Sequence, residues 1–369
     1  MATLVKESTA ATIEQVAAQA YKIPTDGVES DGTLTWDSTT MVVVHVSAGG
    51  KVGMGYTYAD ASAAGAVLHL LADPIKRLNA MDVPACRDAM VQAARNDGDS
   101  GIAAMAIAAV DAALWDLKGK LLDLPLALLL GQVRETVPVY GSGGFTSYSM
   151  DRLRGQMEDW VVEGIPRVKM KIGLDIRDER NRVREVRSAI GLEPELFVDA
   201  SGAFDRKQAL AMADVLAGQR VTWFEEPVSH RDLDGLRLLR DRCHSGVDIA
   251  AGEYGYEPTY FRRMLEAGAV DVLQADVTRC GITGFLRVAA LCDAFCLPLS
   301  AHGAPSLTVH PACAASSLRH IEYFHDHVRI EHMLFDGAPK PSGGSLRPDL
   351  ARPGVGLELK LADAKRYET

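Results

Sequence analysis

Short apolar runs and amphipathic stretches alternate along the last two-thirds of the chain. After Gly131, eight apolar runs predict β-strands. They cover residues 137–140, 167–172, 196–199, 222–224, 247–250, 270–274, 297–301 and 328–330. Most of these runs are separated by stretches with helical periodicity. Eight strands that alternate with helices favour a parallel barrel over a sandwich.

The first third of the chain has a different pattern. Residues 38–46 are rich in Thr and Val, and two glycines separate them from a second run at 51–58, which predicts a hairpin. Small and apolar residues recur at spacings of three and four across 101–130, which predicts a buried helix. We therefore expect an α+β domain over residues 1–130 and the barrel over 131–335. Residues 336–369, with several Pro and Gly, predict an extended tail.

Charged side chains stand at the ends of seven of the predicted strands. They are Lys169 and Lys171, Asp199, Glu225, Glu253, Asp276, His302 and Glu331. From Asp199 onward the intervals are 26, 28, 23, 26 and 29 residues, one strand-plus-helix unit each time. A single Asp after a strand is more often a helix cap or a turn residue. Charged residues that recur once in every strand-plus-helix unit predict a shared pocket, because all carboxyl ends of the strands in a parallel barrel lie on one rim.

Three adjacent strands supply only carboxylates. Asp199, Glu225 and Glu253 would repel one another at close range unless a cation neutralised them. All-oxygen ligation suits a hard divalent ion, Mg²⁺ first and Mn²⁺ second. Zinc is disfavoured because neither a thiolate nor an imidazole belongs to this trio.

Two possible bases flank the predicted metal site. Lys169 and Lys171 alternate along one strand, so both side chains should enter the barrel. We expect each ammonium to lower the proton affinity of the other, so that one lysine can act as a base near neutral pH. On the other side, Asp276 would hold one nitrogen of His302 and raise the basicity of the other. Without Asp276 on the neighbouring strand, we would interpret His302 as a buried core histidine whose hydrogen bonds are satisfied.

A metal ion between two bases suits removal of the proton next to a carboxylate. That proton is barely acidic, so the enolate needs stabilisation by Mg²⁺ and by hydrogen-bond donors. Glu331, placed here at the end of the last strand, would donate to a substrate carboxylate oxygen if burial preserved its proton.

Composition narrows the choice of partners. The chain has 369 residues, of which 47% are hydrophobic and 24% charged, as in soluble globular proteins large enough for two domains. The net charge of −10 and the lack of any Lys/Arg-rich run argue against nucleic acid. We find neither a signal peptide nor an apolar run of spanning length, so we expect a cytoplasmic protein without a membrane anchor. The six cysteines show no paired C-x-x-C spacing.

The motifs that contain these residues resemble a known family. They are V-K-M-K-I-G (168–173), V-D-A-S (198–201), F-E-E-P (224–227), A-G-E (251–253), Q-A-D-V-T-R-C-G-I-T-G (274–284), S-A-H-G (300–303) and I-E-H (330–332), together with A-V-D-A-A-L-W-D-L-K-G-K (109–120) and P-G-V-G-L-E (353–358). In combination and order they resemble the mandelate racemase subgroup of the enolase superfamily, the mandelate racemase/muconate lactonizing enzymes, over nearly the whole chain. Enolase-superfamily sites pair a Lys or His base with magnesium.

The resemblance implies a fold and a set of roles. The fold is a modified TIM barrel, (β/α)7β, with an N-terminal α+β capping domain that the C-terminal tail rejoins. Lys171 becomes one base, tuned by Lys169, and His302, held by Asp276, becomes the opposite base or acid. Asp199, Glu225 and Glu253 become ligands of one Mg²⁺, and Glu331 faces the carboxylate of a small-molecule substrate. The resemblance also implies a homo-oligomer, an octamer or a dimer.

Two positions depart from the family pattern. Ser201 stands where relatives often have Asn or His, and a missing His removes an acid that some sugar-acid dehydratases use. After Asp276 there is one glycine, Gly281, where relatives usually have two. We expect the missing glycine to shorten the loop and to leave Asp276 in place.

The fold by itself does not select the reaction. The resemblance implies that two cap loops set specificity, here residues 25–36 and 55–60, and both carry hydroxyls and carboxylates. Such loops favour a polyol chain over an aryl group, although ordinary solvated loops have the same composition. We therefore expect dehydration of a sugar acid to a 2-keto-3-deoxy acid. A racemase, epimerase or cycloisomerase that uses the same enolate is the alternative, and a ligand-binding barrel without catalysis is the second alternative.

Overall fold

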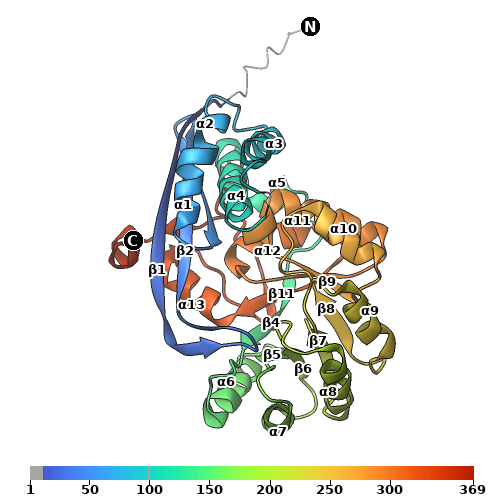
Figure 1. The fold of residues 1–369 in the computed structure, drawn as a ribbon. Coiled ribbons are helices and arrows are strands. Elements are labelled where there is room, and N and C mark those ends of the chain that lie inside the picture. The colour runs from blue at the N-terminus through green and yellow to red at the C-terminus, as the bar shows by residue number, and fades with distance from the viewer. Residues whose placement is uncertain (1–10, 99) are drawn as a thin grey trace.

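The structure is a computed structural model that describes residues 11–98 and 100–369. Its centre is a closed barrel of eight parallel strands, in which each strand pairs with the next along the chain (Figure 1). The last strand closes the barrel on the first, with Ile321 opposite Val139. The strands are β4 (Val137–Gly143), β5 (Arg167–Lys171), β6 (Glu195–Asp199), β7 (Val221–Glu225), β8 (Asp248–Ala251), β9 (Val272–Ala275), β10 (Leu299–Ala301) and β11 (Leu318–Phe324).

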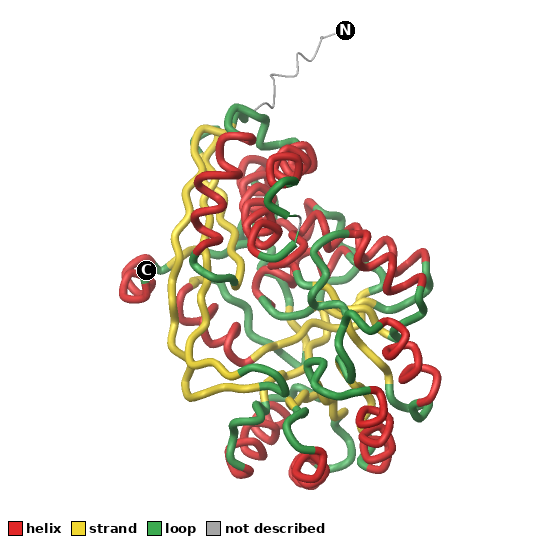
Figure 2. Tube along the Cα trace, viewed as in Figure 1, coloured by secondary structure: helices red, strands yellow, loops and turns green. Residues whose placement is uncertain are grey.

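Seven helices connect the eight strands and cover the outside of the barrel (Figure 2). They are α6 (Met150–Val162), α7 (Ile176–Ile190), α8 (Arg206–Gly218), α9 (Leu233–Arg242), α10 (Pro258–Glu266), α11 (Val277–Ala294) and α12 (Pro305–Ala314). This architecture confirms the predicted (β/α)7β barrel. Within the described parts of the chain, no helix has both the length and the apolar character that crossing a membrane requires.

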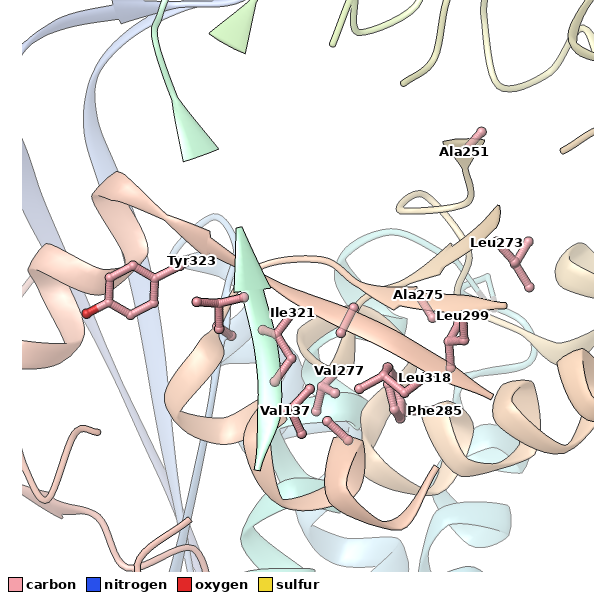
Figure 3. Close-up of a cluster of buried hydrophobic side chains, with 14 of the residues drawn as sticks. Val137, Ala251, Leu273, Ala275, Val277, Phe285, Leu299, Leu318, Ile321 and Tyr323 are labelled. Atoms are coloured by element: carbon pink, nitrogen blue, oxygen red, sulfur yellow. The ribbon is translucent and has the colours of Figure 1, made fainter. Parts of the chain in front are cut away.

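For the eighth barrel strand, the predicted position was wrong. Residues 328–330 lie in helix α13 (His325–Leu334), and the strand is β11, at Leu318–Phe324. Polar and apolar side chains alternate over residues 320–323 of β11, and Ile321 packs in the core between strands and helices (Figure 3). The alternate residues, His320 and Glu322, face the barrel interior, so the strand has no continuous apolar run.

An antiparallel sheet and several helices form the cap (Figure 1). The predicted hairpin is present as β2 and β3, but the long strand β1 that pairs with β2 was not predicted. The predicted helix at 101–130 breaks at Asp123, which has a left-handed φ of 53°, before Pro125. The elements are β1 (Ile13–Ser30), β2 (Thr35–Ala48), β3 (Lys51–Tyr58), α1 (Ser62–Ala66), η1 (Val67–Leu71), α2 (Ala72–Ile75), α3 (Val83–Ala94), α4 (Ile102–Leu122) and α5 (Leu126–Leu129).

Two buried aspartates of α4 tie the cap to the rest of the chain. Asp111 accepts hydrogen bonds from the backbone and side chain of Thr283 in α11. Asp116 accepts from the backbone N–H groups of Met54 in β3 and Val355 in the tail. Each carboxylate satisfies backbone donors that burial would otherwise leave unpaired. These hydrogen bonds hold α4 of the cap against α11 of the barrel and against the C-terminal tail.

The C-terminal segment runs back along the barrel to the first strand of the cap, and its end lies beside β1 (Figure 1). Thr369 donates its backbone N–H to the carbonyl of Ala20. The tail contains β12 (Phe335–Asp336), β13 (Ser345–Leu346), β14 (Glu358–Leu359), α14 (Leu361–Ala364) and the 3₁₀ turn η2 (Lys365–Tyr367).

Candidate active site

Three buried carboxylates meet at the carboxyl ends of neighbouring strands. Asp199 ends β6, Glu225 ends β7, and Glu253 follows β8 by two residues. One oxygen from each lies within 4.8 Å of the others. Three carboxylates this close, without thiolate or imidazole in the group, fit a hard divalent cation. The side chains that the sequence predicted as ligands are therefore brought together.

The electrostatics of the trio indicate why these carboxylates would bind a cation. Burial raises the pKa of Glu225, and the neighbouring charge of Asp199 raises it further. For Asp199, burial also opposes ionisation, but Lys171 and Lys169 outweigh it and hold the pKa of this carboxyl well below its usual range. Burial and the charge of Asp199 thus both oppose ionisation of Glu225, and a divalent cation among the carboxylates would offset both effects.

Lys169 and Lys171 enter the barrel from β5. The Nζ of Lys171 lies 2.5 Å from Oδ2 of Asp199, and the Nζ of Lys169 lies 2.6 Å from Oε1 of Glu225. The neighbouring carboxylates act against the lowered proton affinity that the sequence predicted for these lysines. Burial lowers the pKa of both lysines, but attraction to Asp199 for Lys171, and chiefly to Glu225 for Lys169, more than offsets it. A cation among the carboxylates would weaken this attraction.

His302 and Asp276 form the predicted dyad. Nδ1 of His302 lies 2.9 Å from Oδ2 of Asp276, whose other oxygen accepts from the backbone and hydroxyl of Thr278. Nε2 of His302 lies 3.3 Å from Oε2 of Glu253. Burial lowers the pKa of His302, but the carboxylates of Glu253 and then Glu322 raise it to about 9 overall.

The two bases approach the trio from different sides. Lys171 contacts Asp199 at one end of the row of metal-ligand candidates, and His302 contacts Glu253 at the other. The two basic side chains therefore lie at opposite ends of the row of carboxylates.

The last strand supplies a carboxylate that we did not predict. Glu322, on β11, has Oε1 2.8 Å from Nζ of Lys169 and Oε2 3.4 Å from Nε2 of His302. It also accepts hydrogen bonds from the hydroxyl of Ser142 and the backbone of Gly303. The alternation of polar and apolar residues over 320–323 is the signal in the sequence that identifies it.

Glu331, predicted for this position, lies elsewhere, in helix α13. Its carboxyl group accepts from the hydroxyl of Tyr56 at 2.7 Å and from the backbone of Ser306 at 3.0 Å. Burial raises its pKa to about 7, although these hydrogen bonds act in the opposite direction. Glu331 thus anchors a cap strand to the barrel.

The two departures from the family pattern leave the dyad and the trio intact. Ser201 has a left-handed φ of 48° and donates its backbone N–H to Oδ1 of Asp199 at 2.8 Å. Gly281 interrupts helix α11 with φ 75°, and a side chain there would lie 2.8 Å from Asp111. The single glycine therefore provides the break in α11, and Asp276 keeps its place at the start of that helix.

The two cap segments predicted to set specificity differ from simple loops. Most of residues 25–36 belongs to strands β1 and β2, and the turn between them rests on the barrel rim: a side chain on Gly32 would come within 2.8 Å of the carbonyls of Ile172 and Ala200. Within 55–60, Tyr56 and Tyr58 lie on β3 and contact helix α13 through Glu331 and His327.

Comparison with known proteins agrees with this geometry. Residues 28–131 match the family model "Mandelate racemase / muconate lactonizing enzyme, N-terminal domain", and residues 152–364 match "Enolase C-terminal domain-like". A 3,6-anhydro-alpha-L-galactonate cycloisomerase of Streptomyces coelicolor is 32% identical over 94% of this chain and 97% of its own.

Solved structures show the same fold. A mandelate racemase/muconate lactonizing enzyme-like protein from Rubrobacter xylanophilus has 52% identity and a TM-score of 0.95, over 97% of this chain and 100% of its own. The L-talarate/galactarate dehydratase of Salmonella typhimurium, liganded with Mg and L-lyxarohydroxamate, has 25% identity and a TM-score of 0.90, over 100% and 96%. The chain therefore belongs to the mandelate racemase/muconate lactonizing enzyme family of the enolase superfamily.

Proposed function

We propose that the protein dehydrates an acid sugar to a 2-keto-3-deoxy acid. The observation that carries the proposal is the placement of Lys171 and His302 at opposite ends of the Asp199–Glu225–Glu253 trio. Removal of the proton next to a carboxylate needs a base on one face and, for loss of a hydroxyl, an acid within reach.

The trio would hold one Mg²⁺, or Mn²⁺ in its place. The relative from Salmonella that contains Mg supports this assignment. Once bound, the ion supplies positive charge that stabilises the negative charge developing on the substrate carboxylate. The residues around it then do the proton chemistry.

Lys171 removes the proton, with Lys169 beside it. His302 is oriented by Asp276 and would donate a proton from Nε2 to the departing hydroxyl. We propose that Glu322, and not Glu331, faces the substrate carboxylate, because Glu322 lies between Lys169 and His302. Glu331 is engaged with the cap.

Cycloisomerisation is the second candidate. The relative from Streptomyces coelicolor, a cycloisomerase that aligns over nearly the whole chain, favours it. In that case the same enolate would expel or accept an oxygen within the substrate and no water would be lost.

A substrate panel separates these candidates. Purified protein with Mg²⁺ is incubated with aldonic, aldaric and anhydro-aldonic acids, and products are identified by mass and by semicarbazide reaction for 2-keto acids. We expect one acid to lose 18 mass units and to yield a 2-keto-3-deoxy acid. A product of unchanged mass would favour isomerisation, and no turnover on any acid would contradict both candidates. The variant Lys171→Ala is the control for contaminating activity.

We also propose that the protein acts in the cytoplasm as a homo-oligomer, a dimer or an octamer. Its six cysteines are all free, as in reducing compartments. Val28 and Leu34 expose apolar side chains at the end of the β1–β2 hairpin, where a second subunit would cover them. Light scattering gives the mass in solution, and a mass of about 40 kDa would contradict the oligomer.

A further inference from the structure

His327, a residue outside the predicted site, lies between the cap and the segment that follows His302. The ring of His327, in the first turn of α13, stacks on the ring of Tyr58 from cap strand β3, with centroids 3.6 Å apart and planes within 4°. Phe324 packs edge-on against the same imidazole at 4.9 Å. Two aromatic neighbours hold this ring in one orientation.

A backbone hydrogen bond determines the tautomer of His327. Its Nδ1 lies 3.1 Å from the backbone nitrogen of Ala304. A backbone N–H can only donate, so Nδ1 must be an unprotonated acceptor. The neutral ring therefore carries its hydrogen on Nε2. Burial, followed by the charge of His302, lowers the pKa of His327 to about 4, which keeps the ring neutral.

The position of the ring relates it to the catalytic residues. His302, Gly303 and Ala304 are consecutive, and Gly303 donates its backbone N–H to Glu322. A side chain on Gly303 would lie 2.7 Å from Nδ1 of His327, so this glycine is what allows the close approach. His327 thus lies between the segment that carries His302 and Tyr58 of the cap.

The other nitrogen of His327 is free to bind something else. Among the residues that the structure describes, none hydrogen-bonds to its Nε2. His327 is buried, with 8% of its surface exposed. Its Nε2 atom is nevertheless not one of the fully buried polar atoms that lack a hydrogen-bond partner, so it remains accessible. A donor in a fixed direction, on a ring that is stacked on Tyr58 and in edge contact with Phe324, is a preorganised group for ligand recognition.

We propose that His327 is a specificity-determining residue whose Nε2–H donates a hydrogen bond to an oxygen of the polyol chain of the bound acid sugar. The inference rests on the proposed function. The catalytic groups would act at the first carbons of the substrate, and Nε2 of His327 would then lie next to the rest of the substrate chain. His327 would then select acids that carry a hydroxyl group within hydrogen-bond reach of its Nε2.

Two variants separate the nitrogens of His327. In His327→Asn, the amide oxygen can replace Nδ1 as acceptor for Ala304, but the donor at Nε2 is lost. In His327→Gln, the amide nitrogen reaches the position of Nε2 and keeps a donor there. His332→Asn is the matched control, because His332 lies on the same helix and contacts Tyr323 instead.

The Mg²⁺-loaded proteins are titrated calorimetrically with galactarate and gluconate, and with glycolate as an acid that lacks a polyol chain. We expect His327→Asn to weaken the longer acid that binds by about 10- to 100-fold, and His327→Gln to weaken it less. Glycolate should bind all variants with similar affinity, and His332→Asn should behave as the parent. Equal affinity of His327→Asn and the parent for the longer acid would overturn the inference. Failure of the parent to bind either longer acid would instead overturn the proposed acid-sugar function.

The tautomer is tested without any ligand. Nitrogen-15 spectra of histidine-labelled protein, assigned by the signal lost in His327→Gln, should show Nε2 protonated and Nδ1 bare at pH 7. A proton on Nδ1 would overturn the inference whatever acid the protein binds.

Discussion

Nζ of Lys169 lies 2.8 Å from Oε1 of Glu322, which joins the second strand of the barrel to the eighth across β4. Ser142, on β4 between them, donates to the same carboxylate oxygen at 2.6 Å. All three side chains are buried. The ion pair places the carboxylate of Glu322 between Lys169 and His302.

This pair leads to a test of which glutamate acts on the substrate. We expect Glu322→Gln to reduce turnover by about 10²- to 10⁴-fold, as loss of a positioned acid or base does. Glu331→Gln should keep most of the activity but lower the free energy of unfolding by about 1–3 kcal/mol, because the NH2 group of Gln cannot accept the hydrogen bond of either Tyr56 or Ser306. Turnover and urea unfolding are measured on both variants. Loss of activity in Glu331→Gln alone would refute the reassignment.

Removal of the metal should stop the reaction. We expect a chelator to abolish turnover and added Mg²⁺ to restore it, and Mg²⁺ should raise the melting temperature since it binds only the folded site. Asp199→Asn, Glu225→Gln and Glu253→Gln should each reduce that thermal shift. Asp241→Asn, an exposed acid on α9, is the control. Full turnover in excess chelator would contradict the site.

The two bases should differ in hydrogen exchange. If the substrate hydrogen faces Lys171, then Lys171→Ala should stop both turnover and exchange of that hydrogen with D₂O. His302→Asn should stop turnover but leave the exchange, because Lys171 still removes and returns the proton. If the hydrogen faces His302, the two results should be interchanged. Proton NMR of substrate in D₂O measures the exchange.

The dyad provides the control for this experiment. Asp276→Asn should resemble His302→Asn in milder form, because it changes the tautomer and leaves the imidazole. Near-normal turnover in both Lys171→Ala and His302→Asn would rule out the two-base mechanism.

A buried glutamate of the cap should make stability depend on pH. Glu29 accepts from the indole of Trp36, and burial, followed by repulsion from Asp326, raises its pKa to about 8. The folded protein therefore binds a proton that the unfolded chain releases from about pH 4.5 upward, so the contribution of Glu29 to stability falls as pH rises through about 8.

Glu29→Gln should remove this dependence. We expect the variant to gain about 1–3 kcal/mol in unfolding free energy relative to the parent between pH 5 and pH 9. Urea unfolding at several pH values measures it, with Glu14→Gln, an exposed glutamate on the same strand, as the control. Parallel pH profiles for parent and Glu29→Gln would show that Glu29 is already ionised in the folded protein.

The sequence by itself determined the barrel and most of its rim. Seven strands, Asp199, Glu225, Glu253 and the Asp276–His302 pair followed from apolar runs and from the regular spacing of charges, because parallel strands bring residues one repeat apart to one edge. These signals are local or periodic, so they are visible along the chain before any contact is known.

Only the tertiary structure decided the last strand and the groups that depend on it. β11 turns polar residues into the barrel, so its pattern lacks the apolar run by which the other strands were found, and Glu331 was placed where Glu322 lies. The protonation of Lys171 and the tautomer of His327 likewise depend on partners distant in sequence, Asp199 and Ala304. Burial and distance set these properties, and both arise when the cap closes on the barrel and the eighth strand pairs with the first.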